Sequence, residues 1–159
     1  MNKYFEVKPG STLYEEYFAY LGNRKKVTAA FDKVCEEFGI ETKSFYMTNR
    51  TFRIVPTDAD REKFSGTMKK TSEGEFKKTS EPYKLWMSLT KDIAPVTKPE
   101  LFYYMKDLIG RWRERMFDVD GKLYCSIERE SEEEMETPEW VDEMKASEFY
   151  KILEESEEK

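Results

Sequence analysis

The sequence contains no histidine. This absence excludes Ser-His-Asp triads, histidine general bases and the commonest zinc sites. Cysteine is also scarce, and the two present, Cys35 and Cys125, form neither a C-x-x-C motif nor a zinc-ligand spacing. Both fall on apolar positions of expected elements, so we expect two reduced core thiols and no disulfide.

Long apolar runs are missing as well. No run reaches the length of a membrane span, and the first residues lack the apolar core of a signal peptide. We therefore expect an intracellular, cytoplasmic protein. The glycine motifs of nucleotide-binding loops are absent, and no set of residues stands out as a catalytic or metal site. The expectation is a protein without a cofactor that is not an enzyme.

Aromatic residues and charge are abundant. Ten Tyr, eleven Phe and three Trp among 159 residues favour a folded chain. The net charge is −6, but residues 128–159 alone carry −10, which leaves +4 for residues 1–127. The overall acidity argues against non-specific binding of nucleic acid. The uneven distribution leaves room for a basic patch on the body of the protein.

Periodicity predicts a repeated order of elements. The first half reads as a strand over 3–7, a helix over 13–21 that Gly22-Asn23 ends, a helix over 27–38, and a hairpin of 43–48 with 51–55. The second half reads as a short extended piece from Phe76, helices over 83–92 and 101–109, and a hairpin of 112–117 with 123–127. A last strand over 140–145 precedes a helix that Ser147 caps.

These elements predict an α+β fold with an internal duplication, packed as one compact unit. The expected segments are a β-α-α-β-β half over 1–64, a polar linker over 65–75, a second such half over 76–128, and an acidic linker with a β-α addition over 129–159.

A short motif accompanies the repeat. Lys8 and Lys77 each begin Lys-x-x-Ser-x-x-Tyr, and Lys145 begins a version that is one residue shorter. Each serine stands where a helix is expected to start, and free N–H groups and the helix dipole at that end attract anions. The candidate anion-binding residues are therefore Lys8, Ser11, Lys77, Ser80, Lys145 and Ser147. Helix capping alone is the alternative explanation for these residues.

A second basic feature is the alternation in Arg111-Trp112-Arg113-Glu114-Arg115. On a strand, Arg111, Arg113 and Arg115 would share one face, which adds them to the candidate anion-binding set. An exposed strand face explains the same alternation.

The three motif segments resemble parts of small uncharacterised proteins carried by phages and prophages of Gram-positive bacteria. The segments that carry this resemblance are 8–14, 77–83 and 144–154. The resemblance implies a phage accessory protein that interferes with a host system, without implying an activity.

Three functions follow as hypotheses. The first is a binding protein that antagonises host defence by sequestering a phosphate-bearing small molecule, such as a nucleotide signal. The second is an inhibitor that binds a host protein through the acidic residues 128–159, which would mimic nucleic acid or engage a basic surface. The third is an enzyme that uses carboxylates and a metal ion, for which no ligand cluster stands out.

Overall fold

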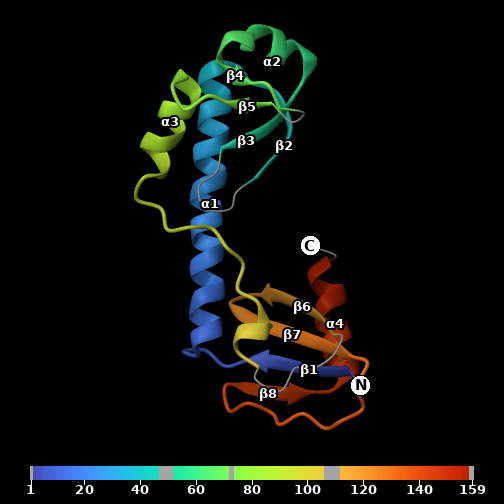
Figure 1. The fold of residues 1–159 in the computed structure, drawn as a ribbon. Coiled ribbons are helices and arrows are strands. Elements are labelled where there is room, and N and C mark those ends of the chain that lie inside the picture. Colours follow the sequence, from blue (N-terminus) through green and yellow to red (C-terminus); the bar gives the residue numbers. More distant parts are fainter. Residues whose placement is uncertain (1, 47–51, 72–73, 106–111, 158–159) are drawn as a thin grey trace. The chain divides into compact units, whose positions relative to one another are not determined.

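The computed structural model describes residues 2–46, 52–71, 74–105 and 112–157 (Figure 1). It contains helices and antiparallel strands, which confirms the α+β class. Where the sequence predicts one compact unit, the chain divides into two. Unit 1 consists of Met1–Phe18 and Pro99–Lys159, and unit 2 consists of Ala19–Lys98. Among the described residues, no helix is both long and apolar enough to cross a membrane.

Unit 1 is built on a four-stranded antiparallel sheet in the order β6-β7-β1-β8. The strands are β1 (Asn2–Val7), β6 (Trp112–Val119), β7 (Lys122–Arg129) and β8 (Val141–Met144). β6 and β7 are joined by Asp120 and Gly121, whose φ angles are 49° and 81°. Two consecutive positive φ angles define the tight turn that suits the twist of a hairpin. The predicted second hairpin is therefore confirmed.

The two faces of this sheet carry alternate residues of each strand. On one face packs α4 (Ala146–Glu157), whose Phe149 ring lies 4.9 Å from that of Tyr4 and 5.3 Å from that of Phe117. The register places on the other face a set of buried apolar side chains: Phe5, Val7, Met116, Leu123, Cys125, Ile127 and Val141. The sheet therefore has an apolar surface on both sides.

Unit 2 combines helices with two short strand pairs. β2 (Thr42–Tyr46) and β3 (Arg53–Pro56) pair antiparallel, as the sequence predicts, and their connection lies outside the described residues. β4 (Met68–Lys69) and β5 (Glu75–Phe76) form the second pair, with Met68 buried inside the segment that the sequence presents as a polar linker. The helices are α2 (Asp58–Lys63), the 3₁₀ turn η2 (Ser65–Thr67) and α3 (Glu81–Thr90).

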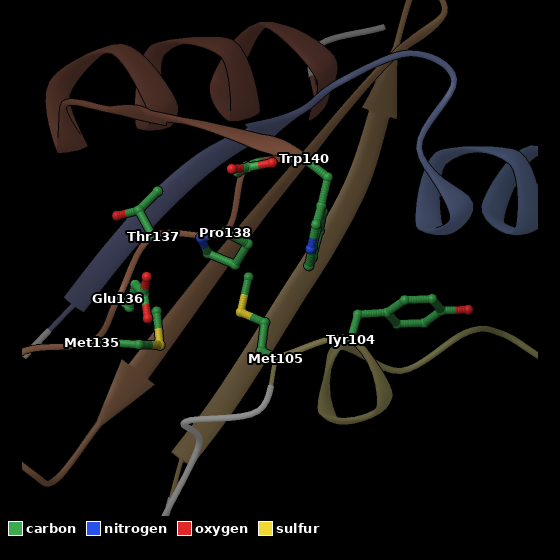
Figure 2. Close-up of a pocket in the computed structure, with 8 residues that line it drawn as sticks. Tyr104, Met105, Met135, Glu136, Thr137, Pro138 and Trp140 are labelled. Atoms are coloured by element: carbon green, nitrogen blue, oxygen red, sulfur yellow. The ribbon is translucent and has the colours of Figure 1, made fainter.

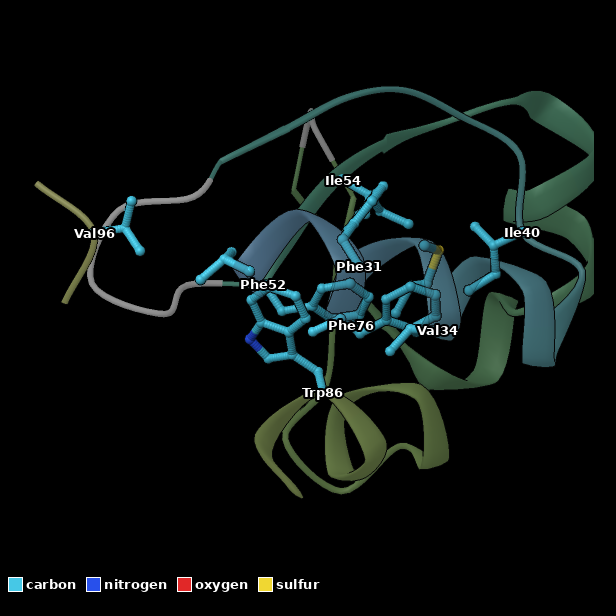
Figure 3. Packing of buried hydrophobic residues seen from close by; sticks show 11 residues of the cluster. Phe31, Val34, Ile40, Phe52, Ile54, Phe76, Trp86 and Val96 are labelled. Atoms are coloured by element: carbon cyan, nitrogen blue, oxygen red, sulfur yellow. The ribbon is translucent and has the colours of Figure 1, made fainter. Parts of the chain in front are cut away.

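Aromatic rings form the core of unit 2 (Figure 3). The Phe52 ring lies 6.0 Å from Phe31, 5.3 Å from Phe76 and 5.1 Å from Trp86. Trp86 is fully buried. Phe52 directly precedes β3, and around it meet side chains from α1, β5 and α3. Side chains that are distant in sequence therefore define this core.

The first helix contradicts a prediction. α1 runs without a break from Thr12 to Phe38, so Gly22-Asn23 does not end it. The φ angle of Gly22 is not in the left-handed region that a glycine helix stop requires, and a Cβ at this position would meet nothing within 4 Å. A single glycine costs a helix about 1 kcal/mol. The buried residues Val27, Phe31 and Val34 offset this cost by packing in the core.

The internal repeat is not confirmed. One helix replaces the two that were expected in the first half, and in the second half η3 (Leu101–Tyr103) is a 3₁₀ turn where an α-helix over 101–109 was expected. Residues 106–111 lie outside the described part of the chain. The Leu101 N–H donates to a carboxylate oxygen of Glu114 on β6 at 3.0 Å, so a tertiary bond satisfies the group that a helix cap would have satisfied.

Candidate functional site

The two complete Lys-x-x-Ser-x-x-Tyr motifs form the same local structure. Before α1, the Ser11 hydroxyl donates to the Lys8 carbonyl at 2.8 Å and accepts from the Tyr14 N–H at 3.3 Å. Before α3, Ser80 makes the equivalent bonds at 2.6 Å and 3.4 Å. Each motif is a turn that closes on its lysine carbonyl and then caps a helix. Capping therefore accounts for the two serines, while the bonds use only backbone atoms of the lysines and tyrosines.

These bonds leave little for an anion at either place. A serine hydroxyl has one proton to donate, and both Ser11 and Ser80 donate it to backbone. The Lys8 ammonium lies 3.7 Å from the Asp142 carboxylate. The Lys77 ammonium donates to the Gly66 carbonyl at 3.2 Å. The local geometry thus serves the fold first.

The third motif has a different structure, and the prediction that Ser147 caps a helix is wrong. α4 begins at Ala146, so Ser147 is already inside its first turn. The Phe149 N–H donates to the Lys145 carbonyl at 3.1 Å, which makes Lys145 the residue that precedes the helix. The helix here begins directly after the lysine, so Ser147 lies two residues past the capping position.

Within unit 1, the structure keeps Lys8 and Lys145 apart. β1 and β8 pair with Val7 opposite Val141 and Tyr4 opposite Met144. Lys8 therefore lies beyond one end of this strand pair and Lys145 beyond the other. Five residues of extended chain separate the two positions, a distance of about 17 Å. Lys77 belongs to unit 2.

Two of the three alternating arginines, Arg113 and Arg115, have the predicted geometry. Arg113 and Arg115 share the sheet face on which α4 packs, opposite Glu128 and Ser126, and both are exposed. Trp112, Glu114 and Met116 take the other face, as expected. Arg111 lies outside the described residues.

A pocket of about 320 Å³ opens in unit 1 (Figure 2). It is lined by Tyr104, Met105, Met135, Glu136, Thr137, Pro138, Glu139 and Trp140. In Figure 2 the side chains of Met105, Met135 and Trp140 surround a common space, while the Tyr104 ring extends away from it. Met105 and Met135 are buried, whereas Glu136 and Glu139 are exposed. The pocket therefore has an apolar floor and an acidic rim.

Several contacts fix the walls of this pocket. The Trp140 carbonyl accepts from the Lys8 N–H at 2.9 Å, which ties its backbone to the end of β1. The rings of Tyr104 and Trp140 meet edge to face, with centroids 6.2 Å apart. The Tyr104 hydroxyl donates to the Glu16 carboxylate in the first turns of α1. Both the backbone and the ring of Trp140 are therefore held in place.

A second hollow, of about 420 Å³, lies in unit 2 beside α1 and α3. Its lining residues are Lys26, Ala29, Ala30, Lys33, Leu89, Asp92 and Ile93. Lysine and aspartate both contribute to this lining, so it has no clear preference for one sign of charge. Within the described ranges, no group of three or more Cys, Asp or Glu residues is arranged to hold a metal ion.

The residues of the acidic pocket were not identified as a site from the sequence. The sequence predicts a helix over 101–109, which includes Tyr104 and Met105, and an acidic linker around Met135. The available signal was Met135 itself, because one apolar residue inside the glutamate run 132–136 needs an apolar neighbour. The partners of Met135 could not be predicted, since they depend on where a 3₁₀ turn some thirty residues earlier lies against the sheet.

Comparison of the chain with protein-family models, with curated proteins and with solved structures finds no match in any of the three. No residue role is therefore carried over from a relative. The function proposed below is argued from the geometry and charge of the chain's own residues.

Proposed function

We propose that the protein is a non-enzymatic binding protein that engages a basic surface of a partner protein through residues 128–159. The observation that carries this proposal is the division of charge between the units. Unit 1 has a net charge of −11 and unit 2 of +5, counted over the full sequence within the unit bounds. A surface with one dominant sign of charge steers oppositely charged partners and repels others.

The carboxylates of this segment are directed to solvent. Thirteen of its acidic residues are exposed: Glu128, Glu130, Glu132, Glu133, Glu134, Glu136, Glu139, Asp142, Glu143, Glu148, Glu154, Glu155 and Glu157. Asp142 and Glu143 lie on β8, which is an edge strand of the sheet. Because such charges discourage pairing of further strands at that edge, the edge favours side-chain contacts with a partner over sheet extension.

The partner class follows from the resemblance of the motif segments to phage accessory proteins. A bacterial host protein with a basic surface, such as a nucleic-acid-binding defence protein, is the first partner to test. Occupying that surface with carboxylates would keep it from binding phosphate groups, which is the mode of action of a nucleic-acid mimic.

The test is affinity capture from bacterial extract with the full chain as bait, followed by identification of retained proteins. We expect a stoichiometric basic protein that elutes with rising salt. Replacing Glu132, Glu133 and Glu134 with Gln should remove it. The matched control replaces the exposed Glu36, Glu37 and Glu62 of unit 2 with Gln and should retain it. Equal loss, or equal retention, in the two variants would contradict the proposal.

A phosphate-bearing small molecule is the second candidate ligand. The observation that favours it is the pair of exposed arginines, Arg113 and Arg115, on one face of β6. Thermal shift against cyclic and linear nucleotides tests it, with Arg113→Ala/Arg115→Ala as the variant. The lysine variants Lys8→Ala, Lys77→Ala and Lys145→Ala test the motif in the same assay. No shift with any nucleotide would remove this candidate.

A further inference from the structure

We propose that the pocket of unit 1 receives an arginine side chain from the basic segment of the partner. This inference rests on the proposed function and specifies the contact at its centre. The pocket's volume of about 320 Å³ is within the range of sites that enclose a side chain or small ligand.

The floor of the pocket suits the hydrocarbon stem of an arginine. Met105 and Met135 line the pocket and are 3% and 6% exposed, so they close its floor with apolar side chains of which only a small part faces the pocket. Methionine side chains adapt to the shape of a partner, which is why they recur at binding surfaces. Pro138 adds a rigid apolar wall.

The Trp140 ring suits the guanidinium group. A planar guanidinium stacks on aromatic faces, and tryptophan is the strongest partner for such cation–π contacts. The edge-to-face contact with Tyr104 and the backbone bond from Lys8 hold the ring before any ligand arrives. A wall that is already ordered lowers the entropy lost on binding.

The rim of the pocket selects a cation. Glu136 and Glu139 line it, and none of the described residues that line it is basic. Carboxylates accept two parallel bonds from a guanidinium, a geometry that the ammonium group of lysine cannot reproduce. The aromatic stacking surface and the two acceptor oxygens of each carboxylate therefore favour arginine over lysine.

The experiment titrates the ¹⁵N-labelled full chain with a capped Gly-Ser-Arg-Ser-Gly peptide and follows the three tryptophan indole N–H signals. Trp140→Phe assigns the signal of Trp140. We expect that signal to shift with saturation, while the signal of Trp86 in the core of unit 2 stays in place. The same peptide with lysine in place of arginine should bind more weakly. The same peptide with citrulline, which is isosteric with arginine but neutral, should not bind.

Two variants separate the pocket from general attraction between charges. Replacing Glu136 and Glu139 with Gln should raise the Kd at least about tenfold, since charge-assisted bonds are lost. Replacing the exposed Glu36 and Glu37 of unit 2 with Gln removes the same charge outside the pocket lining and outside residues 128–159, and it should raise the Kd less than about twofold. Thermal melting of each variant confirms that it is folded.

Three outcomes would overturn the inference. The first is an unmoved Trp140 signal, and the second is an equal effect of the two double variants on the Kd. The third is binding of the lysine peptide, or of free arginine, that is at least as tight as binding of the arginine peptide. Tight binding of free arginine would instead identify a small-molecule site. Each outcome is distinct from failure of the proposed function, because loss of a captured partner on neutralising Glu132, Glu133 and Glu134 does not depend on the pocket.

Discussion

Ser80 and Ser147 occupy similar motifs but have different structural roles. Ser80 is 4% exposed and bridges the Lys77 carbonyl and the Tyr83 N–H, whereas Ser147 is exposed within the first turn of α4. Replacing Ser80 with Ala should lower the free energy of unfolding by about 1–2 kcal/mol, and Ser147→Ala should change it by less than about 0.5 kcal/mol. Urea unfolding followed by circular dichroism measures both. Equal costs would mean that Ser147 contributes a cap after all.

The Cys125 thiol should make the free energy of unfolding depend on pH in the alkaline range. Burial, with a smaller contribution from the Glu114 carboxylate, raises the pKa of Cys125 from 9.0 to about 12. The unfolded chain loses this proton near pH 9, whereas the folded protein keeps it until the pH approaches 12. Deprotonation thus favours the unfolded state within that window, and stability falls as the pH rises through it.

Cys125→Ala tests this dependence. Between pH 8 and pH 10 the wild type should lose about 1 kcal/mol more free energy of unfolding than the variant, beyond any constant cost of the substitution. Urea titrations at both pH values give the comparison. Parallel losses in the two proteins would show that the thiol is not the group responsible.

At the scale of elements, Gly22 tests the continuity of α1. A Cβ at Gly22 would meet nothing within 4 Å and its φ is not positive, so Gly22→Ala should raise the free energy of unfolding by about 0.5–1 kcal/mol. Gly121 is the matched control, because its surroundings are equally open but its φ is +81°. Gly121→Ala should therefore destabilise the protein. A helix that ended at Gly22 would reverse the first result.

The elements also show what the sequence could and could not predict. Alternation in 112–127 was sufficient for the hairpin of β6 and β7 and for the faces of Arg113 and Arg115, since period and turn chemistry are local. The break at Gly22 was wrong because packing of the later turns of α1 outweighs one glycine. The acidic pocket depends on contacts between residues 104–105 and 135–140, which no local pattern encodes.

For the whole molecule, the division into two units predicts that one of them folds by itself. Unit 2 is the continuous stretch Ala19–Lys98, and its buried core consists of its own residues: Val27, Ala30, Phe31, Val34, Ile40, Phe52, Ile54, Met68, Phe76, Trp86 and Val96. Eighty residues around one apolar core are enough for a cooperative domain.

A fragment of residues 19–98 should therefore unfold in a single urea transition. Trp86 is the sole tryptophan between these bounds and is fully buried, so its fluorescence reports on the core without interference. The fragment carries +5 against −6 for the full chain, so it should also bind a cation exchanger at pH 7 that the full chain does not bind. Cutting α1 at residue 19 removes its first turns and the Ser11 cap, which should lower stability by about 1 kcal/mol or more without abolishing the transition. A gradual, non-cooperative loss of the Trp86 signal would show instead that the core of unit 2 needs the rest of the chain to form.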